Sequence, residues 1–140
     1  MQEKTLEITS DEIEYYVEFG REINEQFSNF KAGIFSDKSS YEATFAKKCY
    51  YTDLLNYYID LFISHHKVHA FFDGNKRTAL FYLDINISLI HLETENTELF
   101  LDNLDDIAIA QVMYLEKEIT EDDLKQIVID NVRTVDNINI

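Results

Sequence analysis

The stretch Ala79–Ile90, with the sequence ALFYLDINISLI, is apolar nearly all round and is interrupted only by Asp84, Asn86 and Ser88. A helix without a polar face has to be covered on every side, so this pattern is typical of a helix in the centre of a bundle. The chain has no proline and three glycines, so residues that break helices are almost absent. The sequence therefore predicts an all-α fold.

Two capping boxes mark the starts of outer helices. Thr9-Ser-Asp-Glu12 precedes apolar residues at helical spacing, and we expect this helix to run to about Phe27. Thr120-Glu-Asp-Asp123 opens another amphipathic helix near the end of the chain. The tail from Thr134 alternates only weakly, and no element is predicted there.

Two further amphipathic segments lie between these ends. A helix or helix pair is predicted over residues 41–68, and another helix near residues 102–117. Residues 29–40 lose the helical period and are predicted to form a loop, with a short extended piece at 32–35. We therefore expect a compact bundle of about six helices around the central buried helix.

Length and composition limit the class of protein. With 140 residues, 46% of them hydrophobic, the chain is long enough for one domain over residues 1–140. No apolar run is long enough to cross a bilayer and the N-terminus lacks the regions of a signal peptide, so we expect a cytoplasmic protein with no membrane association. The single cysteine, Cys49, is expected to be a small buried residue without a chemical role.

The charge argues against nucleic acid as a partner. The chain has 12 basic and 27 acidic residues, and its net charge of −15 repels DNA and RNA. Residues 41–77 differ from the rest, because they hold five cations and four anions. A nearly neutral region in an acidic protein suits an anion site, although ordinary sampling would also produce it.

A dense polar cluster lies just before the central helix. The stretch His69-Ala-Phe-Phe-Asp-Gly-Asn-Lys-Arg77 surrounds one glycine with charged and polar groups. The first turn of a helix has unpaired backbone N–H groups and the positive end of the dipole, so it can bind phosphate. Gly74 lets the backbone take a conformation closed to other residues, and Lys76 and Arg77 add full charges.

Two other side chains of the cluster suit group transfer. A neutral His69 can take a proton from a hydroxyl at pH 7, and Asp73 can hold a Mg²⁺ ion that neutralises the phosphates of a nucleotide. A base, a metal ligand and an anion cradle are the parts that transfer of a phosphate-containing group to a hydroxyl requires. Taken singly, His69 could instead satisfy a helix end, and Asp73 and Asn75 could cap the next helix.

The spacing His69-x-Phe71-x-Asp73-Gly74-Asn75-Lys76-Arg77 resembles the signature of the Fic/Doc family, H-x-F-x-(D/E)-G-N-(G/K)-R. The continuation KRTAL over residues 76–80 resembles the Doc branch of that family. A match at every specified position arises by chance in fewer than about one in a million chains of this length. The helical pattern on both sides is similar to the all-α core of the family.

The resemblance implies a role for each position of the motif. His69 would be the general base, Phe71 would anchor the loop in the core, and Asp73 would bind Mg²⁺. The groups that hold the phosphates of the nucleotide would come from the following turn, namely Gly74, Asn75, Lys76 and Arg77. The catalytic set would be His69, Lys76 and Arg77.

Lys76 decides the branch within the family. Members with glycine at this position transfer AMP, whereas Doc-like toxins with lysine bind the nucleotide the other way round and transfer its terminal phosphate. The AMP-transferring pattern usually has a second arginine where this chain has Leu80. The resemblance thus implies a toxin that uses ATP or another nucleoside triphosphate with Mg²⁺ to phosphorylate a Ser, Thr or Tyr hydroxyl of a protein. Translation elongation factor Tu is the candidate target.

Doc-like toxins are neutralised by an antitoxin, and the sequence predicts that restraint comes from another chain. The internal inhibitory signature of the family, (S/T)-x-x-x-E-(G/N), is absent, and the nearest match, residues 94–98, is followed by Leu99. An antitoxin protein is therefore an expected partner. In this interpretation, residues 29–40 could form the edge that positions a target segment.

Three other interpretations fit parts of the sequence. A Fic-type AMP transferase would use the same residues, and a catalytically silent protein-binding module would keep the fold without turnover. A zinc site is a third alternative, because His65 and His69 are four residues apart and His91 could join them. No glutamate occupies the general-base position between the two histidines, so the zinc site is disfavoured.

Overall fold

The computed structural model describes residues 4–94 and 98–135, and within them most of the chain is helical. The elements are, in order, α1 (Ser10–Phe27), α2 (Lys38–Ala46), the 3₁₀-helix η1 (Lys47–Tyr50), α3 (Leu54–Lys67), α4 (Asn75–Leu89), α5 (His91–Thr94), β1 (Leu99–Leu101), α6 (Leu104–Leu115), α7 (Glu121–Asp130) and β2 (Val132–Thr134). The predicted helical class is confirmed. Among these elements, no helix has the length and apolarity that a membrane crossing requires.

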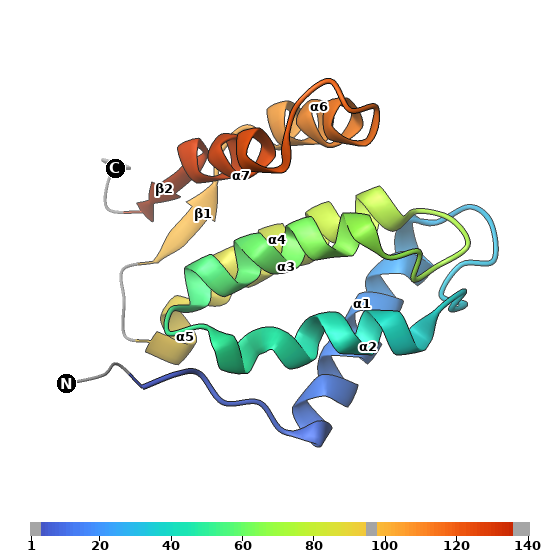
Figure 1. Cartoon of the computed structure of the whole chain (residues 1–140), viewed down its shortest axis with the longest axis horizontal. Helices are drawn as coiled ribbons and strands as arrows, with labels where there is room; N and C mark the ends of the chain where they lie inside the picture. Colours follow the sequence, from blue (N-terminus) through green and yellow to red (C-terminus); the bar gives the residue numbers. More distant parts are fainter. Residues whose placement is uncertain (1–3, 95–97, 136–140) are drawn as a thin grey trace.

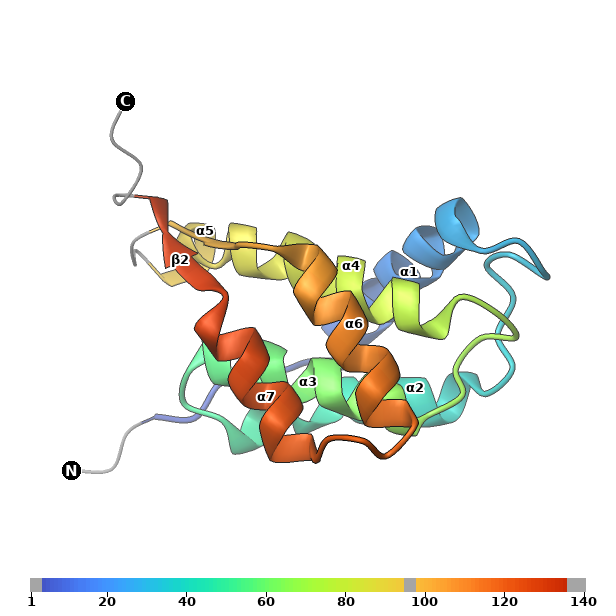
Figure 2. The same ribbon diagram turned by 90° about the horizontal axis from the view of Figure 1, so that it is seen from above.

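The helices stack in layers (Figures 1 and 2). α3 and α4 lie side by side, with α1 and α2 packed on one side of them. On the other side α6 and α7 pair with each other, and α6 crosses α4 while α7 crosses α3. The largest fully buried side chains come mainly from α2, α3 and α4, so the core lies between the layers.

The helix starts follow the local signals. Both capping boxes form: the Thr9 hydroxyl accepts the N–H of Glu12 at 3.1 Å, and the Thr120 hydroxyl accepts the N–H of Asp123 at 3.1 Å. The segment predicted as a helix or helix pair is a pair, because Asp53 caps a new helix after η1. α2 begins at Lys38, inside the predicted loop, because the Asp37 carboxylate caps it through the N–H of Ser40.

The sequence-based prediction missed a two-stranded ribbon. β1 and β2 pair antiparallel, with Leu99 opposite Thr134 and Leu101 opposite Val132. Three residues per strand are too few to show a period, so neither strand could be recognised along the sequence. Residues 95–97 of the weak match to the inhibitory signature and residues 136–140 of the tail lie outside the described residues.

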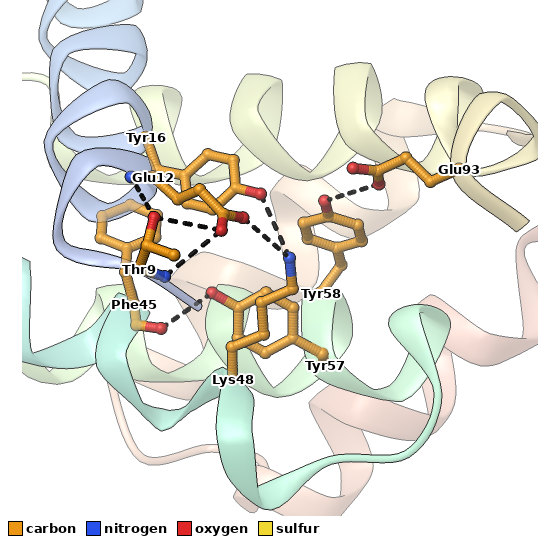
Figure 3. A network of polar contacts seen from close by, with 8 residues as sticks. All are labelled: Thr9, Glu12, Tyr16, Phe45, Lys48, Tyr57, Tyr58 and Glu93. Carbon is orange, nitrogen blue, oxygen red and sulfur yellow. Dashed lines mark hydrogen bonds and ion pairs between the residues drawn. The ribbon is translucent and has the colours of Figure 1, made fainter. Parts of the chain in front are cut away.

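The expectation for Cys49 is wrong, because its side chain is exposed. In the turn η1 the buried residue is its neighbour Lys48, which is 6% exposed. The Lys48 ammonium donates to the Tyr16 hydroxyl at 3.1 Å and lies 4.0 Å from the Glu12 carboxylate (Figure 3). The ammonium also lies 5.9 Å from the ring centroid of Tyr57 on α3, so this buried cation links α1, η1 and α3.

Candidate functional site

The first turn of α4 opens on a cleft of about 580 Å³ whose opposite wall is α6. Every residue that the motif predicted for the site lines this cleft: His69, Asp73, Gly74, Asn75, Lys76 and Arg77. The remaining wall is largely apolar and includes Leu80, Ala108, Val112 and Leu115. The structure therefore brings the complete predicted set together around one cavity.

The backbone at the start of α4 has the form of an anion cradle. Gly74 precedes the helix with φ 73° and ψ 18°, and no side chain caps the helix start. The first backbone bond of the helix runs from the Thr78 N–H to the Gly74 carbonyl at 2.9 Å. The N–H groups of residues 75–77 have no acceptor within the described parts of the chain. They are free to bind the oxygens of a phosphate.

Cations surround this turn. Lys76 and Arg77 are both exposed, and the Arg77 guanidinium donates to the Phe27 carbonyl at the end of α1. A third cation, Lys31, was not predicted; its ammonium lies 4.4 Å from the ring centroid of Phe72, which lines the cleft. Lys31 comes from the loop after α1, and only the fold brings it near the motif.

His69 lies in the segment between α3 and α4, and its side chain is exposed at the cleft. Its ring has no hydrogen-bond partner among the residues the structure describes. The segment itself is held by the two residues that follow the histidine. The Ala70 carbonyl accepts the N–H of Ser36 at 2.7 Å, and Phe71 is 1% exposed and stacks on Phe35 at 5.0 Å. His69 therefore reaches the cleft from a firmly anchored backbone.

The Asn75 side chain is bound to the loop that precedes it. Its Oδ1 accepts the N–H of Phe71 at 2.9 Å, and its Nδ2 donates to the Phe71 carbonyl at 2.8 Å. This pair of bonds closes the loop on itself. The backbone N–H of Asn75 is therefore the group that could bind a phosphate, while its side chain keeps the loop in shape.

Asp73 also supports the fold around the site. Its Oδ2 accepts the N–H groups of Asn29 and Phe30, at 3.1 and 3.2 Å, and the Ser28 hydroxyl at 3.1 Å. Hydrogen bonds to the carboxylate, that of the Asn29 N–H first and that of Ser28 next, lower the pKa of Asp73 below its ordinary value. The side chain is therefore a carboxylate at neutral pH.

The donors at the cleft fit Mg²⁺ only as part of a nucleotide complex. Asp73 is the one acid among the described residues that line it, and no group of three potential ligands was found in those parts of the chain. Mg²⁺ is usually bound by one or two carboxylates together with waters and substrate phosphates. Asp73 with a bound polyphosphate would satisfy this requirement.

Asn24 on α1 was missed by the sequence analysis, although it holds the cradle from behind. It is fully buried, and its Nδ2 donates to the Asp73 carbonyl at 2.8 Å and to the Thr78 hydroxyl at 3.1 Å. Its Oδ1 accepts the N–H of Gly33 at 2.8 Å. A polar residue among the apolar positions of a helix is the signal that could have found it.

The histidines do not form a zinc site. His65 is buried among Tyr41, Phe45 and Tyr82, and burial lowers its pKa to about 3. His69 lies beyond the end of α3, so the two rings do not share a helix face. The spacing of four residues predicted a common face only if the helix continued, and it ends at Lys67.

Gln111 on α6 is a second residue that the sequence analysis missed. It is 2% exposed, lines the cleft and donates to the Lys76 carbonyl at 2.9 Å. Its position as the only polar residue in the stretch Ile107–Leu115 apart from a tyrosine could have drawn attention to it. A buried amide in an apolar helix needs a partner, and here the partner belongs to the cradle.

The comparisons with known proteins give no match: no family model fits the chain, and no curated protein or solved structure is significantly similar to it. The likeness to the Fic/Doc signature stays limited to the motif. What the arrangement can do chemically follows from its geometry. Free backbone N–H groups, two cations, a carboxylate and an exposed imidazole share one cleft, which suits a phosphate-containing ligand next to a hydroxyl.

Proposed function

We propose that this protein is a Mg²⁺-dependent, nucleotide-using transferase that moves the terminal phosphate of ATP to a hydroxyl on a protein. The observation that carries the proposal is that the unpaired first turn of α4 and the exposed His69 line the same cleft. In this proposal the molecule has a Fic/Doc-like bundle with α4 as its central helix. It acts in the cytoplasm as a Doc-like toxin, an antitoxin protein restrains it, and elongation factor Tu is the candidate target.

Each group of the cleft has a task in this reaction. The N–H groups of residues 75–77, with Lys76 and Arg77, bind and orient the phosphates. His69 takes the proton of a Ser, Thr or Tyr hydroxyl as its oxygen bonds to the terminal phosphorus, and the bond from that phosphorus to the nucleoside diphosphate breaks. A Mg²⁺ ion on Asp73 and the phosphates would neutralise the charge of the nucleotide.

The position of Leu80 favours phosphate transfer over AMP transfer. This residue is 8% exposed and belongs to the apolar wall of the cleft, one helical turn after Lys76. An AMP-transferring site of the resembled family usually has its second arginine there. With one phosphate-binding cation fewer and Lys76 at the cradle, the cleft suits the Doc-like orientation of the nucleotide.

The test is the mass added to a target protein. Incubation with ATP, Mg²⁺ and cell extract, followed by mass spectrometry, is expected to show a phosphoryl gain on a hydroxyl residue. His69→Ala is expected to abolish the gain, because neither of the other two histidines that line the described cleft can replace it. His65 is buried, and the ring of His66 is hydrogen-bonded. His91→Ala is the matched control, since His91 lies on α5 beyond the far end of α4.

Other outcomes would replace the proposal. An AMP gain on the target would make the protein a Fic-type AMP transferase. A melting temperature unmoved by ATP and Mg²⁺, together with tight binding of a partner protein, would make it a silent binding module. Full activity of His69→Ala would remove the histidine as the base.

A further inference from the structure

The side-chain amide of Gln111 bridges three helices. Its Nε2 lies 2.9 Å from the carbonyl of Lys76 in the first turn of α4 and 2.8 Å from Nε2 of His66 on α3. Gln111 itself belongs to α6 and is 2% exposed. This bridge is the polar contact between the wall formed by α6 and the turn that forms the anion cradle.

The chemistry of the bridge determines the state of His66. The amide nitrogen of glutamine only donates, so Nε2 of His66 has to accept. The imidazole is then neutral and carries its proton on Nδ1, which donates to the Phe62 carbonyl at 2.7 Å. Burial, opposed by that carbonyl and assisted by the charge of Lys76, lowers the pKa of His66, in agreement with the neutral form.

The two acceptors also determine the orientation of the amide. Both N–H groups of Gln111 are used, one by Lys76 and one by His66. A flipped amide would set its oxygen against the Lys76 carbonyl and lose both bonds. The rest of this wall is lined mainly by apolar side chains such as Leu80, Ala108 and Val112, which have no hydrogen-bonding groups to fix their position. The bridge is therefore what gives the wall a defined register against α4.

We propose that Gln111 is a positioning residue that, with His66 as its acceptor, holds the first turn of α4 so that its N–H groups and Lys76 face the phosphates of the ligand. This inference rests on the proposed function. It assigns no contact with the reacting atoms to either residue. Its physical basis is that a buried hydrogen-bond network restricts the arrangement of the helices it joins.

The test combines nucleotide affinity with the state of the imidazole. Gln111→Met keeps the length of the side chain and removes both donors. The variant is expected to bind ATP with Mg²⁺ about fivefold more weakly, the effect of losing one orienting hydrogen bond. In ¹⁵N NMR spectra, the Nε2 resonance of His66 is expected to shift, because Nε2 loses its donor while Nδ1 keeps its proton on the Phe62 carbonyl. Thr44→Val is the matched control, because it removes a buried hydrogen bond, to the Tyr41 carbonyl, between two residues that do not line the cleft.

Substitutions at His66 give an independent arm, which also decides the case if Gln111→Met does not fold. His66→Gln retains an acceptor for the amide and is expected to bind ATP as the natural protein does. His66→Leu has no acceptor and is expected to weaken binding as Gln111→Met does. Equal affinity of His66→Leu and His66→Gln would overturn the inference, as would unchanged affinity of a folded Gln111→Met.

Arg77→Ala separates this inference from the proposed function. If Arg77→Ala weakens ATP binding and Gln111→Met does not, the cleft binds nucleotides and only the role of Gln111 is refuted. If Arg77→Ala binds ATP as well as the natural protein does, the proposed function is refuted, and the inference that rests on it falls too. Weaker binding in both variants, with normal binding in Thr44→Val, supports both.

Discussion

The polar residues of the motif divide into those whose side chains are free at the cleft and those whose side chains bind other parts of the chain. The Asn75 side chain bonds to the backbone of Phe71, and the Asp73 carboxylate accepts the N–H of Asn29 in the segment after α1. The expectation that Asp73 or Asn75 could cap the next helix is wrong, because no side chain caps α4 and both side chains bind neighbouring segments instead. Gly74 stands apart, because its role is conformational: its φ of 73° is a value that other residues adopt only with strain.

Gly74→Ala is expected to destabilise the protein by about 1 to 2 kcal/mol, because the new residue has to adopt a left-handed conformation. The added Cβ would also meet Cβ of Ser28 at 3.1 Å and Nδ2 of Asn24 at 3.2 Å. Urea unfolding measures the free energy of unfolding, and titration with ATP measures whether the variant still binds the nucleotide.

Gly33→Ala is the matched control for Gly74→Ala, since Gly33 has φ 72° and does not line the cleft, and alanine keeps the N–H that Asn24 accepts. Both variants should lose stability, whereas only Gly74→Ala should also lose ATP affinity. Equal affinity in the two variants would show that the conformation of Gly74 does not shape the cradle.

Among the elements, α1 supports the site although it contributes no group to the cleft. Asn24 in its C-terminal half and Ser28, the residue after its end, hold the cradle through Asp73, and its last carbonyl, that of Phe27, accepts a hydrogen bond from Arg77. Its N-terminal half is tied to η1 and α3 by the buried Lys48 (Figure 3). Substitutions near the N-terminal half of α1 should therefore change the stability of the protein, and substitutions near its C-terminal half should change ligand binding.

Lys48→Met is expected to lower the free energy of unfolding by about 1 to 3 kcal/mol, because the hydroxyl of Tyr16 and the carboxylate of Glu12 lose their cation. ATP affinity should stay unchanged, since Lys48 lies outside the cleft. Lys47→Met, at the exposed neighbouring residue, should change stability by less than about 0.5 kcal/mol. A Lys48→Met variant as stable as Lys47→Met would refute the structural role of the network.

In the whole molecule, the stability is coupled to pH through a histidine that the site does not use. His65 lies in the core against three aromatic rings, and burial lowers its pKa to about 3. Its ordinary pKa is about 6.5, so below that pH the unfolded chain binds a proton that the folded protein excludes. The folded state therefore loses stability as the pH falls below about 6.5.

His65→Phe is expected to make the stability less dependent on pH between about 6.5 and 5. The natural protein should lose up to about 1.4 kcal/mol per pH unit from this one group, and the variant should lack that contribution. Urea unfolding at three pH values measures both slopes. Identical slopes in the two proteins would mean that His65 can be protonated in the folded state.

Local signals along the chain carry much of the fold. Some signals act within a few residues of the chain, namely capping boxes, helical spacing and the absence of proline. They predicted where α1 and α7 start and that α4 runs without interruption. The motif likewise assembles its own loop, because Asn75 bonds to Phe71 four residues away. For the same reason the sequence could predict that the six site residues lie close together.

Packing decided what those signals could not. Asn24 lies 49 residues from Asp73 and Gln111 lies 35 from Lys76, and nothing along the sequence pairs them. In η1, Lys48 is buried and Cys49 exposed, against their hydropathy, because Tyr16 and Glu12 on another helix receive the ammonium. A buried polar group is stable only where a distant element brings its partner. The chain therefore specifies its helices and its motif locally, while the tertiary fold alone selects the residues that hold them in place.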